Sequence, residues 1–194
     1  MCSGLTAYSA IRKAERFVPA NGSVMIVSLG GLGMMGLEIA RALTSARPYA
    51  ADVVPGKREA ALALGAVAAF DPGTPDARKL VLKQAGAMDV AIDFVGSEAS
   101  LTFAQSVVGK GGAVIIVGLM GGRFSLPVPM FPLRELTLAG SYVGSLDEAH
   151  ALMALVREGR IRPIPVSERP LAEANAALDA LRAGGVTGRA ILKP

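Results

Sequence analysis

The sequence predicts an α/β protein built on a doubly wound parallel sheet, and three observations indicate that class. Short runs without any polar face recur along the chain, as at residues 24–27 and 113–117. Such runs are typical of strands buried on both faces of a parallel sheet. Stretches with helical periodicity lie between them, and glycine or proline turns separate the two kinds of segment. This β-α-β alternation is the pattern of a doubly wound fold.

The elements of the sheet can be placed in order. A first strand over 24–27 leads into a glycine cluster and a helix whose amphipathic part covers 37–43. A weak second strand is expected over 48–52, where Pro48 is acceptable as the first residue. The remaining expected elements are a helix over 57–64 ended by Gly65, a strand over 67–70, a helix capped by Thr74 that runs to 84, a strand over 90–95, a helix over 97–108, a strand over 113–117 and, after a proline-rich loop, a strand over 136–142.

The last part of the chain has a different pattern. Two amphipathic helices are expected over 147–158 and 171–182, followed by a lone strand over 189–192. Because one strand cannot satisfy its own backbone groups, it must pair with the sheet or with a partner outside this chain. We therefore expect residues 1–144 to form one domain and residues 145–194 to form a separate C-terminal segment.

The glycine cluster is the feature that points to a ligand. A strand, a glycine turn, a helix and an acidic residue after the next strand, Asp52, together form the pattern of a dinucleotide site. The pyrophosphate would lie at the helix N-terminus, where free N–H groups and the helix dipole favour an anion. Glycines are needed because a Cβ would keep the backbone away from the phosphates.

Two registers of this motif fit the sequence. One is Gly31-x-Gly33-x-x-Gly36, and the other is Ser28-x-Gly30-x-x-Gly33, with serine in the first glycine position. We prefer the second register because it places the turn directly after the strand. The serine would then make the turn less relaxed than a glycine would.

Composition excludes several classes. The chain is 52% hydrophobic and holds one cysteine, Cys2, and no tryptophan, so a disulfide framework is excluded and a cytoplasmic location is expected. The net charge of +4 is scattered over the expected helices without a basic stripe, which argues against nucleic acid. No signal peptide is visible, and the uncharged stretch over 17–37 is interrupted by proline and glycines, which argues against a membrane span.

A set of motifs resembles one family along the whole chain. They are Cys2-x-Gly4-x-Thr6-x-Tyr8, the turn over 28–33, Asp52 with Lys57, Asp93-Phe94-Val95-Gly96, Val117-Gly118-Leu119, Pro132-Leu133-Arg134-Glu135-Leu136, Gly140-Ser141-Tyr142, Glu173-Ala174-Asn175 and Gly188-Arg189. In order and spacing they resemble the zinc-type alcohol dehydrogenases of the medium-chain dehydrogenase/reductase superfamily. The resemblance covers the C-terminal, cofactor-binding half of such an enzyme, which implies a Rossmann fold whose C-terminal helices and strand return to a catalytic domain outside this sequence.

The resemblance implies roles for particular residues. Asp52 would hold the adenosine ribose and repel the extra phosphate of NADP, which favours NAD. Arg58 is a competing feature, because an arginine nearby can accommodate that phosphate. The residues implied in cofactor binding are Ser28, Gly30, Gly31, Leu32, Gly33, Asp52, Lys57, Val95, Gly96, Val117, Gly118, Leu119 and Arg189.

The resemblance also implies zinc in the full-length enzyme, with Cys2 as one ligand. A catalytic zinc needs about three protein ligands, so Cys2 alone cannot hold it tightly. His150 lies in an expected helix without a second ligand at helical spacing. We assign no catalytic residue within this sequence, and we expect the 194-residue chain alone to show neither appreciable alcohol oxidation nor stoichiometric zinc.

The implied activity is hydride transfer between an alcohol or carbonyl substrate and the nicotinamide. Two alternatives remain open: a zinc-free quinone or enoyl reductase, and a nucleotide-binding module without catalysis. The family also implies a homodimer or homotetramer. We expect the contact near residues 118–142, where Leu126 and Val128 alternate with prolines, as at an exposed sheet edge.

Overall fold

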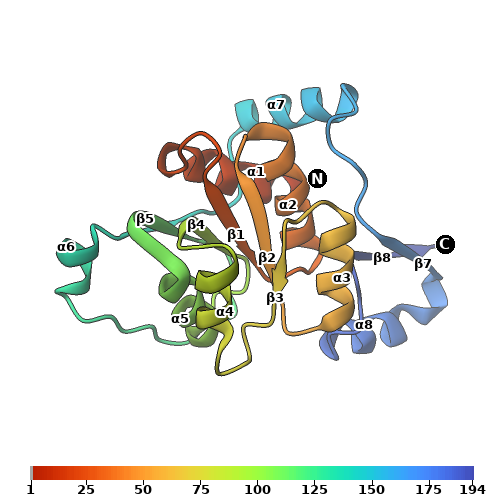
Figure 1. Ribbon diagram of the computed structural model, residues 1–194. Coiled ribbons are helices and arrows are strands. Elements are labelled where there is room, and N and C mark those ends of the chain that lie inside the picture. Colours follow the sequence, from red (N-terminus) through yellow and green to blue (C-terminus); the bar gives the residue numbers. More distant parts are fainter. Residues whose placement is uncertain (1) are drawn as a thin grey trace.

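The computed structural model describes residues 2–194 and confirms the expected parallel sheet (Figure 1). Its six strands lie in the order β3-β2-β1-β4-β5-β6, and every neighbouring pair is parallel. The strands are β1 (Ser23–Val27), β2 (Arg47–Ala51), β3 (Ala69–Phe70), β4 (Met88–Asp93), β5 (Val108–Ile116) and β6 (Thr137–Gly140). This order is that of a Rossmann fold.

The strands end together at one edge of the sheet. Val27 pairs with Ala51 of β2 and with Asp93 of β4, which in turn pairs with Ile116 of β5. The chain order reverses between β1 and β4, because β1 leads to β2 on one side and β4 lies on the other. In open α/β sheets, ligands bind in the crevice at such a reversal, beyond the carboxyl ends of the strands.

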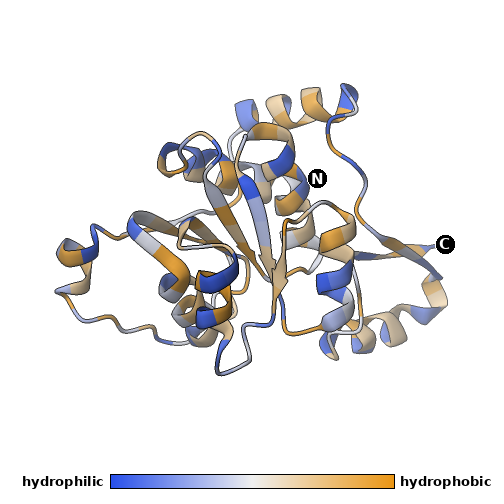
Figure 2. Ribbon diagram, viewed as in Figure 1, coloured by the Kyte–Doolittle hydropathy of each residue, from blue (hydrophilic) through white to orange (hydrophobic). Residues whose placement is uncertain are grey.

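Helices cover both faces of the sheet, and each face has its own apolar core. Ile26 and Ile92 share one core with α1 (Cys2–Ala14), α2 (Gly31–Leu43), α3 (Pro55–Ala63) and α7 (Leu146–Arg157). Met25 and Ala91 point to the opposite core, with α4 (Ala77–Gln84) and α5 (Glu98–Val107). In Figure 2, β5 changes from blue and pale at its glycine-containing start to orange where it enters these cores.

The N-terminal helix α1 has no counterpart among the sequence-based expectations. Its buried residues are Ala7, Tyr8, Ser9, Ala10, Ile11 and Ala14, and it packs against α2 and α7. The spacing of Ala7, Ile11 and Ala14 follows a helical face, so this signal was present in the sequence. A short 3-10 helix, Glu15–Phe17, follows it.

The second strand differs in detail from the expectation. Pro48 is the second residue of β2, not the first, and β2 is an interior strand. Ala50, two residues on, donates its N–H toward the β3 side, to the carbonyl of Ala68. The donor that Pro48 lacks therefore falls on that same side, outside the regular pairing of β2 with β3, which begins at Ala50 and Ala69.

Other helices and strands also begin or end at residues that differ from those expected from the sequence. Thr74 does not cap α4: its hydroxyl donates to the carbonyl of Asp71, and the helix starts three residues later. The glycines at 109, 111 and 112, which follow the helix expected over 97–108, lie inside β5, which begins at Val108. The proline-rich loop expected before the strand over 136–142 contains a short helix, α6 (Met130–Arg134).

The C-terminal segment forms a small sheet of its own, which corrects both pairings expected for the last strand. β8 (Arg189–Lys193) pairs in parallel with β7 (Val166–Pro170), a strand that the sequence pattern did not reveal. A 3-10 helix, Leu171–Glu173, and α8 (Ala174–Arg182) connect the two strands. One isolated bridge, between Gly30 and Gly188, joins this segment to the glycine turn.

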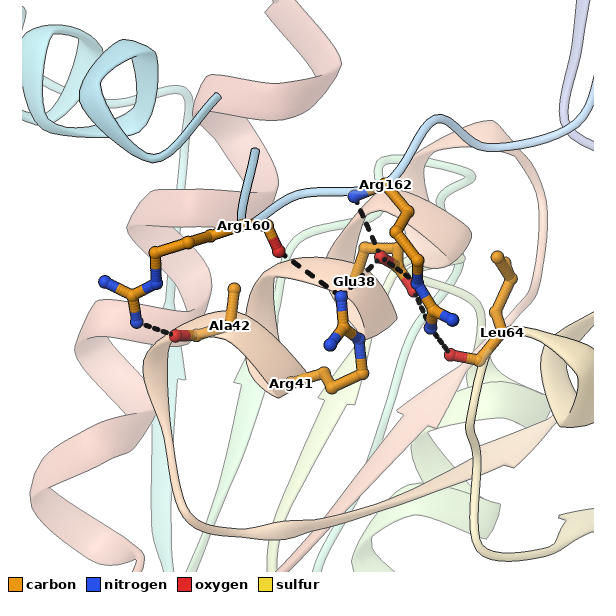
Figure 3. A network of polar contacts seen from close by, with 6 residues as sticks. All are labelled: Glu38, Arg41, Ala42, Leu64, Arg160 and Arg162. Atoms are coloured by element: carbon orange, nitrogen blue, oxygen red, sulfur yellow. Dashed lines mark hydrogen bonds and ion pairs between the residues drawn. The ribbon is translucent and has the colours of Figure 1, made fainter. Parts of the chain in front are cut away.

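A network of charged groups ties the C-terminal segment to α2 (Figure 3). The Glu38 side chain is fully buried and accepts hydrogen bonds from Arg162 Nη2 at 2.7 Å and Arg41 Nη2 at 3.1 Å. Arg160 donates to the carbonyl of Ala42, at the end of the same helix. Burial alone would raise the pKa of Glu38, but the hydrogen bonds from Arg162 and Arg41 outweigh it and lower the pKa. Glu38 is therefore a carboxylate at neutral pH.

Within residues 2–194, none of the helices combines the length and the apolar character that crossing a membrane would require.

Candidate dinucleotide-binding site

The glycine turn begins with a residue in a left-handed conformation. Ser28 has φ of +75° and donates its N–H to the carbonyl of Ala51, while Gly30 is the N-cap of α2. A non-glycine residue in this region is strained. Ser28 therefore occupies the position where the first glycine of the motif makes the tight turn.

Two glycines of the turn differ sharply in the space around them. A Cβ on Gly33 would lie 1.7 Å from the carbonyl oxygen of Ser28, so the helix can pack on the turn only because Gly33 has no side chain. A Cβ on Gly30 would meet no atom within 4 Å. In the dinucleotide-binding motif, one glycine lets the backbone approach the phosphates and another lets the helix pack closely. Gly30 and Gly33 fit these two roles, which favours the register Ser28-x-Gly30-x-x-Gly33.

Asp52 lies directly after β2 and organises the same turn. Its Oδ2 accepts the N–H of Leu29 at 2.7 Å, and its Oδ1 accepts the N–H of Val54 at 2.9 Å. The residue is 7% exposed. Since each carboxylate oxygen can accept a second hydrogen bond, the group can still hold ribose hydroxyls at its exposed side.

A cavity of about 230 Å³ lies over the start of α2. Gly30, Gly31 and Lys57 line it from the Rossmann side, and Arg189 from β8. The Arg189 side chain lies on Gly31, where a Cβ would come within 2.3 Å of its Nε, and it donates to the hydroxyl of Ser3. The remaining lining is mostly apolar: Ala177, Leu178, Leu181, Gly184, Val186, Gly188, Ala190 and Leu192. Two cationic residues thus line the cavity at the start of α2.

The loops after β4 and β5 pack backbone against backbone. A Cβ on Gly96 would lie 1.9 Å from the oxygen of Gly118, and one on Gly118 would lie 1.9 Å from the carbonyl carbon of Val95. The N–H of Met120 donates to the carbonyl of Val95, and the N–H of Val117 donates to the carbonyl of Asp93. The structure therefore brings together Val95, Gly96, Val117, Gly118 and Leu119, with Leu119 exposed and Val117 buried.

Asp93 holds this pair of loops in place, although from the sequence we assigned it no role beyond membership of a motif. It is fully buried, and it accepts hydrogen bonds from Val95 N, Gly96 N and Ser100 Oγ at 2.8, 3.2 and 2.8 Å. Burial raises the pKa of Asp93 in spite of these three donors. The available signal was an acidic residue directly after the apolar run at residues 90–92.

The comparisons with known proteins agree with this geometry. The model of one family, described as zinc-binding dehydrogenase, matches residues 31–158. The chain belongs to the zinc-binding dehydrogenase family. An NAD-dependent alcohol dehydrogenase from Sulfurisphaera tokodaii is 33% identical over 195 residues, which cover all of this chain but 56% of that protein.

Solved structures of two similar proteins superimpose closely on the chain. The alcohol dehydrogenase from Aeropyrum pernix has a TM-score of 0.92 and 36% identity, covering 99% of this chain and 56% of that one. Acetophenone reductase from Geotrichum candidum, solved in complex with NAD, has a TM-score of 0.85 and 26% identity over 99% of this chain and 53% of that one. The chain thus spans about half the length of the relatives that it matches.

The described part of this zinc-binding dehydrogenase chain does not fit a zinc ion. Cys2 is exposed in α1, and its Sγ lies 4.0 Å from the hydroxyl of Thr6. His150 is exposed in α7. Among residues 2–194 no group of three or more His, Cys, Asp or Glu side chains is placed to hold a metal. Cys2 as a zinc ligand therefore remains a prediction that concerns the full-length protein.

Proposed function

We propose that this chain is the cofactor-binding part of an NAD-dependent alcohol dehydrogenase. The observation that carries the proposal is the open space at Gly30, at the N-terminus of α2 and next to the carboxylate of Asp52. The relatives named NAD-dependent alcohol dehydrogenase support it over a quinone or enoyl reductase and over a module without catalysis.

The residues of the turn account for binding of the pyrophosphate. The first N–H groups of α2 have no partner inside the helix and carry the positive end of its dipole. Gly30 leaves room for phosphate oxygens to approach them. Lys57 and Arg189, which line the cavity, would balance the charge of the diphosphate.

The choice of NAD follows from Asp52. Its carboxylate would accept hydrogen bonds from the ribose hydroxyls, and its charge would repel a phosphate on the 2′ oxygen. Val95 and Gly96 would lie along the adenosine side, and Val117, Gly118 and Leu119 along the nicotinamide. When bound, NAD would supply the hydride chemistry, and the chain's own part would be to bind and orient the cofactor toward an alcohol or carbonyl substrate.

Fluorescence titration of the purified chain with NADH and NADPH tests this proposal. We expect NADH to bind more tightly, and Asp52→Asn to weaken NADH about tenfold or more, because hydrogen bonds to a charged group contribute about 1.5–3 kcal/mol. The asparagine can still accept a backbone hydrogen bond in the turn. Asp76→Asn, at an exposed carboxylate without a side-chain cap hydrogen bond, is the matched control and should change neither affinity. NADPH binding as tightly as NADH would contradict the proposal.

We further propose that two copies associate through the β6 edge, either as a homodimer or within a homotetramer. β6 is the last strand of the sheet, and the segment before it exposes Leu119, Met120 and Val128 at 80, 75 and 78%. Unpaired apolar edges favour association. Phe124 and Leu126 instead pack partly against the core, so Val128 is the better residue to alter.

Light scattering at micromolar concentration tests the association. Val128→Asp should shift the protein to the monomer. Val67→Asp, at an exposed valine just before the opposite edge strand β3, should not. An unaltered chain that is already monomeric, or a dimer that Val128→Asp leaves intact, would refute this interface.

A further inference from the structure

An arginine lies beside the carboxylate proposed to hold the ribose, but it is already paired. Arg58 Nη1 donates to the backbone carbonyl of Asp52 at 2.7 Å and to Asp71 Oδ2 at 3.2 Å. Its side chain is 21% exposed. The guanidinium therefore lies within reach of Asp52 while its charge is directed to Asp71.

Asp71 is held in place independently of this ion pair. It follows β3, whose last residue, Phe70, pairs with Ala51 at the end of β2. Its Oδ1 accepts the N–H of Gly73 at 2.9 Å, and its carbonyl accepts the hydroxyl of Thr74. Such a turn orients an aspartate side chain before any partner arrives. The loop after β3 thus presents a fixed acceptor to Arg58.

The chemistry of these groups bears on which dinucleotide fits. A 2′-phosphate adds negative charge at the ribose, and arginine is well suited to bind phosphate through paired N–H donors. A free Arg58 next to Asp52 would attract that phosphate and offset the repulsion from the Asp52 carboxylate. Pairing with Asp71 neutralises the arginine and fixes its direction.

We propose that Asp71 is a specificity-determining residue that excludes 2′-phosphorylated dinucleotides by holding Arg58 in an ion pair. This inference rests on the proposed function, since it requires a dinucleotide at this site. Discrimination against NADP would then depend on two carboxylates: Asp52, which faces the ribose, and Asp71, which withholds the nearby cation.

Titration of three variants of the chain with NADH and NADPH tests the inference. Asp71→Asn keeps the oxygen that accepts from Gly73 but replaces the acceptor of Arg58 with an N–H group. We expect it to tighten NADPH about five- to tenfold and to change NADH less than twofold. Arg58→Gln alone should leave NADPH affinity unchanged, because the arginine is not available in the unaltered protein. In the double variant the gain of Asp71→Asn should disappear.

The outcomes separate this inference from the proposed function. If Asp71→Asn tightens both cofactors equally, or if its effect on NADPH persists with Arg58→Gln, the loss of a negative charge explains the result and the inference is wrong. A several-fold loss of NADPH affinity in Arg58→Gln alone, readable even if Asp71→Asn does not fold, would also overturn it. Failure of the unaltered chain to bind either dinucleotide would refute the proposed function and this inference together.

Discussion

The six-stranded sheet and the small sheet of β7 and β8 differ in the interactions that stabilise each of them. All five residues of β1 are buried, and the two faces of the sheet contact separate apolar cores. In β7 all but one residue are exposed, and in β8 exposed and half-buried residues alternate. Apolar burial therefore stabilises the Rossmann sheet and also holds α7, whose Leu152 and Leu155 lie in its core. The chain that leads to β7 and β8 is instead joined to α2 by the charged network and to the glycine turn by the Gly30–Gly188 bridge.

The helix α2 contacts both regions, so substitutions in it can test the two regions separately. Its first residues belong to the glycine turn, and its apolar face packs on the sheet. Its buried Glu38 accepts a hydrogen bond from Arg162, which lies in the linker before β7. Substitutions along this one helix should affect the sheet, the site or the C-terminal segment according to position.

The largest effect is expected at Gly33, on the sheet side of the comparison. In Gly33→Ala the methyl group would meet the backbone oxygen of Ser28, so the helix or the turn must shift. We expect the free energy of unfolding to fall by about 3 kcal/mol, measured by urea denaturation. The control is Gly30→Ala, at a position with ordinary φ and open space.

Gly30→Ala should lower stability by about 1 kcal/mol or less, as expected for alanine at an N-cap. It should nevertheless weaken NADH binding at least tenfold, because the methyl group enters the space proposed for the phosphates. Equal losses of stability in the two variants would contradict the packing described for the turn.

The second effect concerns the attachment of the C-terminal segment. Glu38→Gln removes the charge that Arg162 and Arg41 share, and hydrogen bonds to charged groups contribute about 1.5–3 kcal/mol. We expect the free energy of unfolding to fall by about 2 kcal/mol. The substitution should also raise the rate of amide hydrogen exchange more in β7 and β8 than in β1 and β4. Arg182→Gln, at an exposed pair with Asp179 on α8, should change little. Equal loss of protection in both sheets would show that the segment is not separately attached.

A smaller effect is expected from pH, through the same carboxylate. The pKa of Glu38 in the folded protein lies below its ordinary value of 4.5, so its contribution to stability is complete above that value. The contribution is lost as the pH falls through the folded pKa. The difference in unfolding free energy between the unaltered chain and Glu38→Gln should therefore shrink as the pH falls below the ordinary pKa of 4.5. A constant difference would contradict the ion pair.

The smallest effect has the opposite sign and belongs to Asp93, in the sheet. Its folded pKa lies above the ordinary value of 3.8, so the folded protein takes up a proton before the unfolded chain does. Stability from this group rises as the pH falls through the folded pKa toward 3.8. Comparison with Asp93→Asn should isolate this rise in chemical denaturation. An identical pH dependence in both proteins would rule it out.

Much of the sheet could be predicted because buried parallel strands are continuous apolar runs. The turn at residues 28–33 and Asp52 carry their own local chemistry and could also be found in the sequence. β7 could not, since its residues Val166–Pro170 are mostly exposed and show no apolar pattern. The pairing of Arg58 with Asp71 was also hidden, because it depends on the order in which β2 and β3 lie side by side. Long-range contacts of this kind leave no periodicity in the sequence.

The contact of Arg189 with Ser3 joins residues 186 positions apart, directly over Gly31. Closing so long a loop is entropically costly, and distant contacts of this kind slow folding. During synthesis the strands β1 to β6 can assemble well before residue 189 has emerged from the ribosome. The end of the site proposed to hold the pyrophosphate would then be completed last, so a nascent chain would form its sheet before this part of the proposed site is complete.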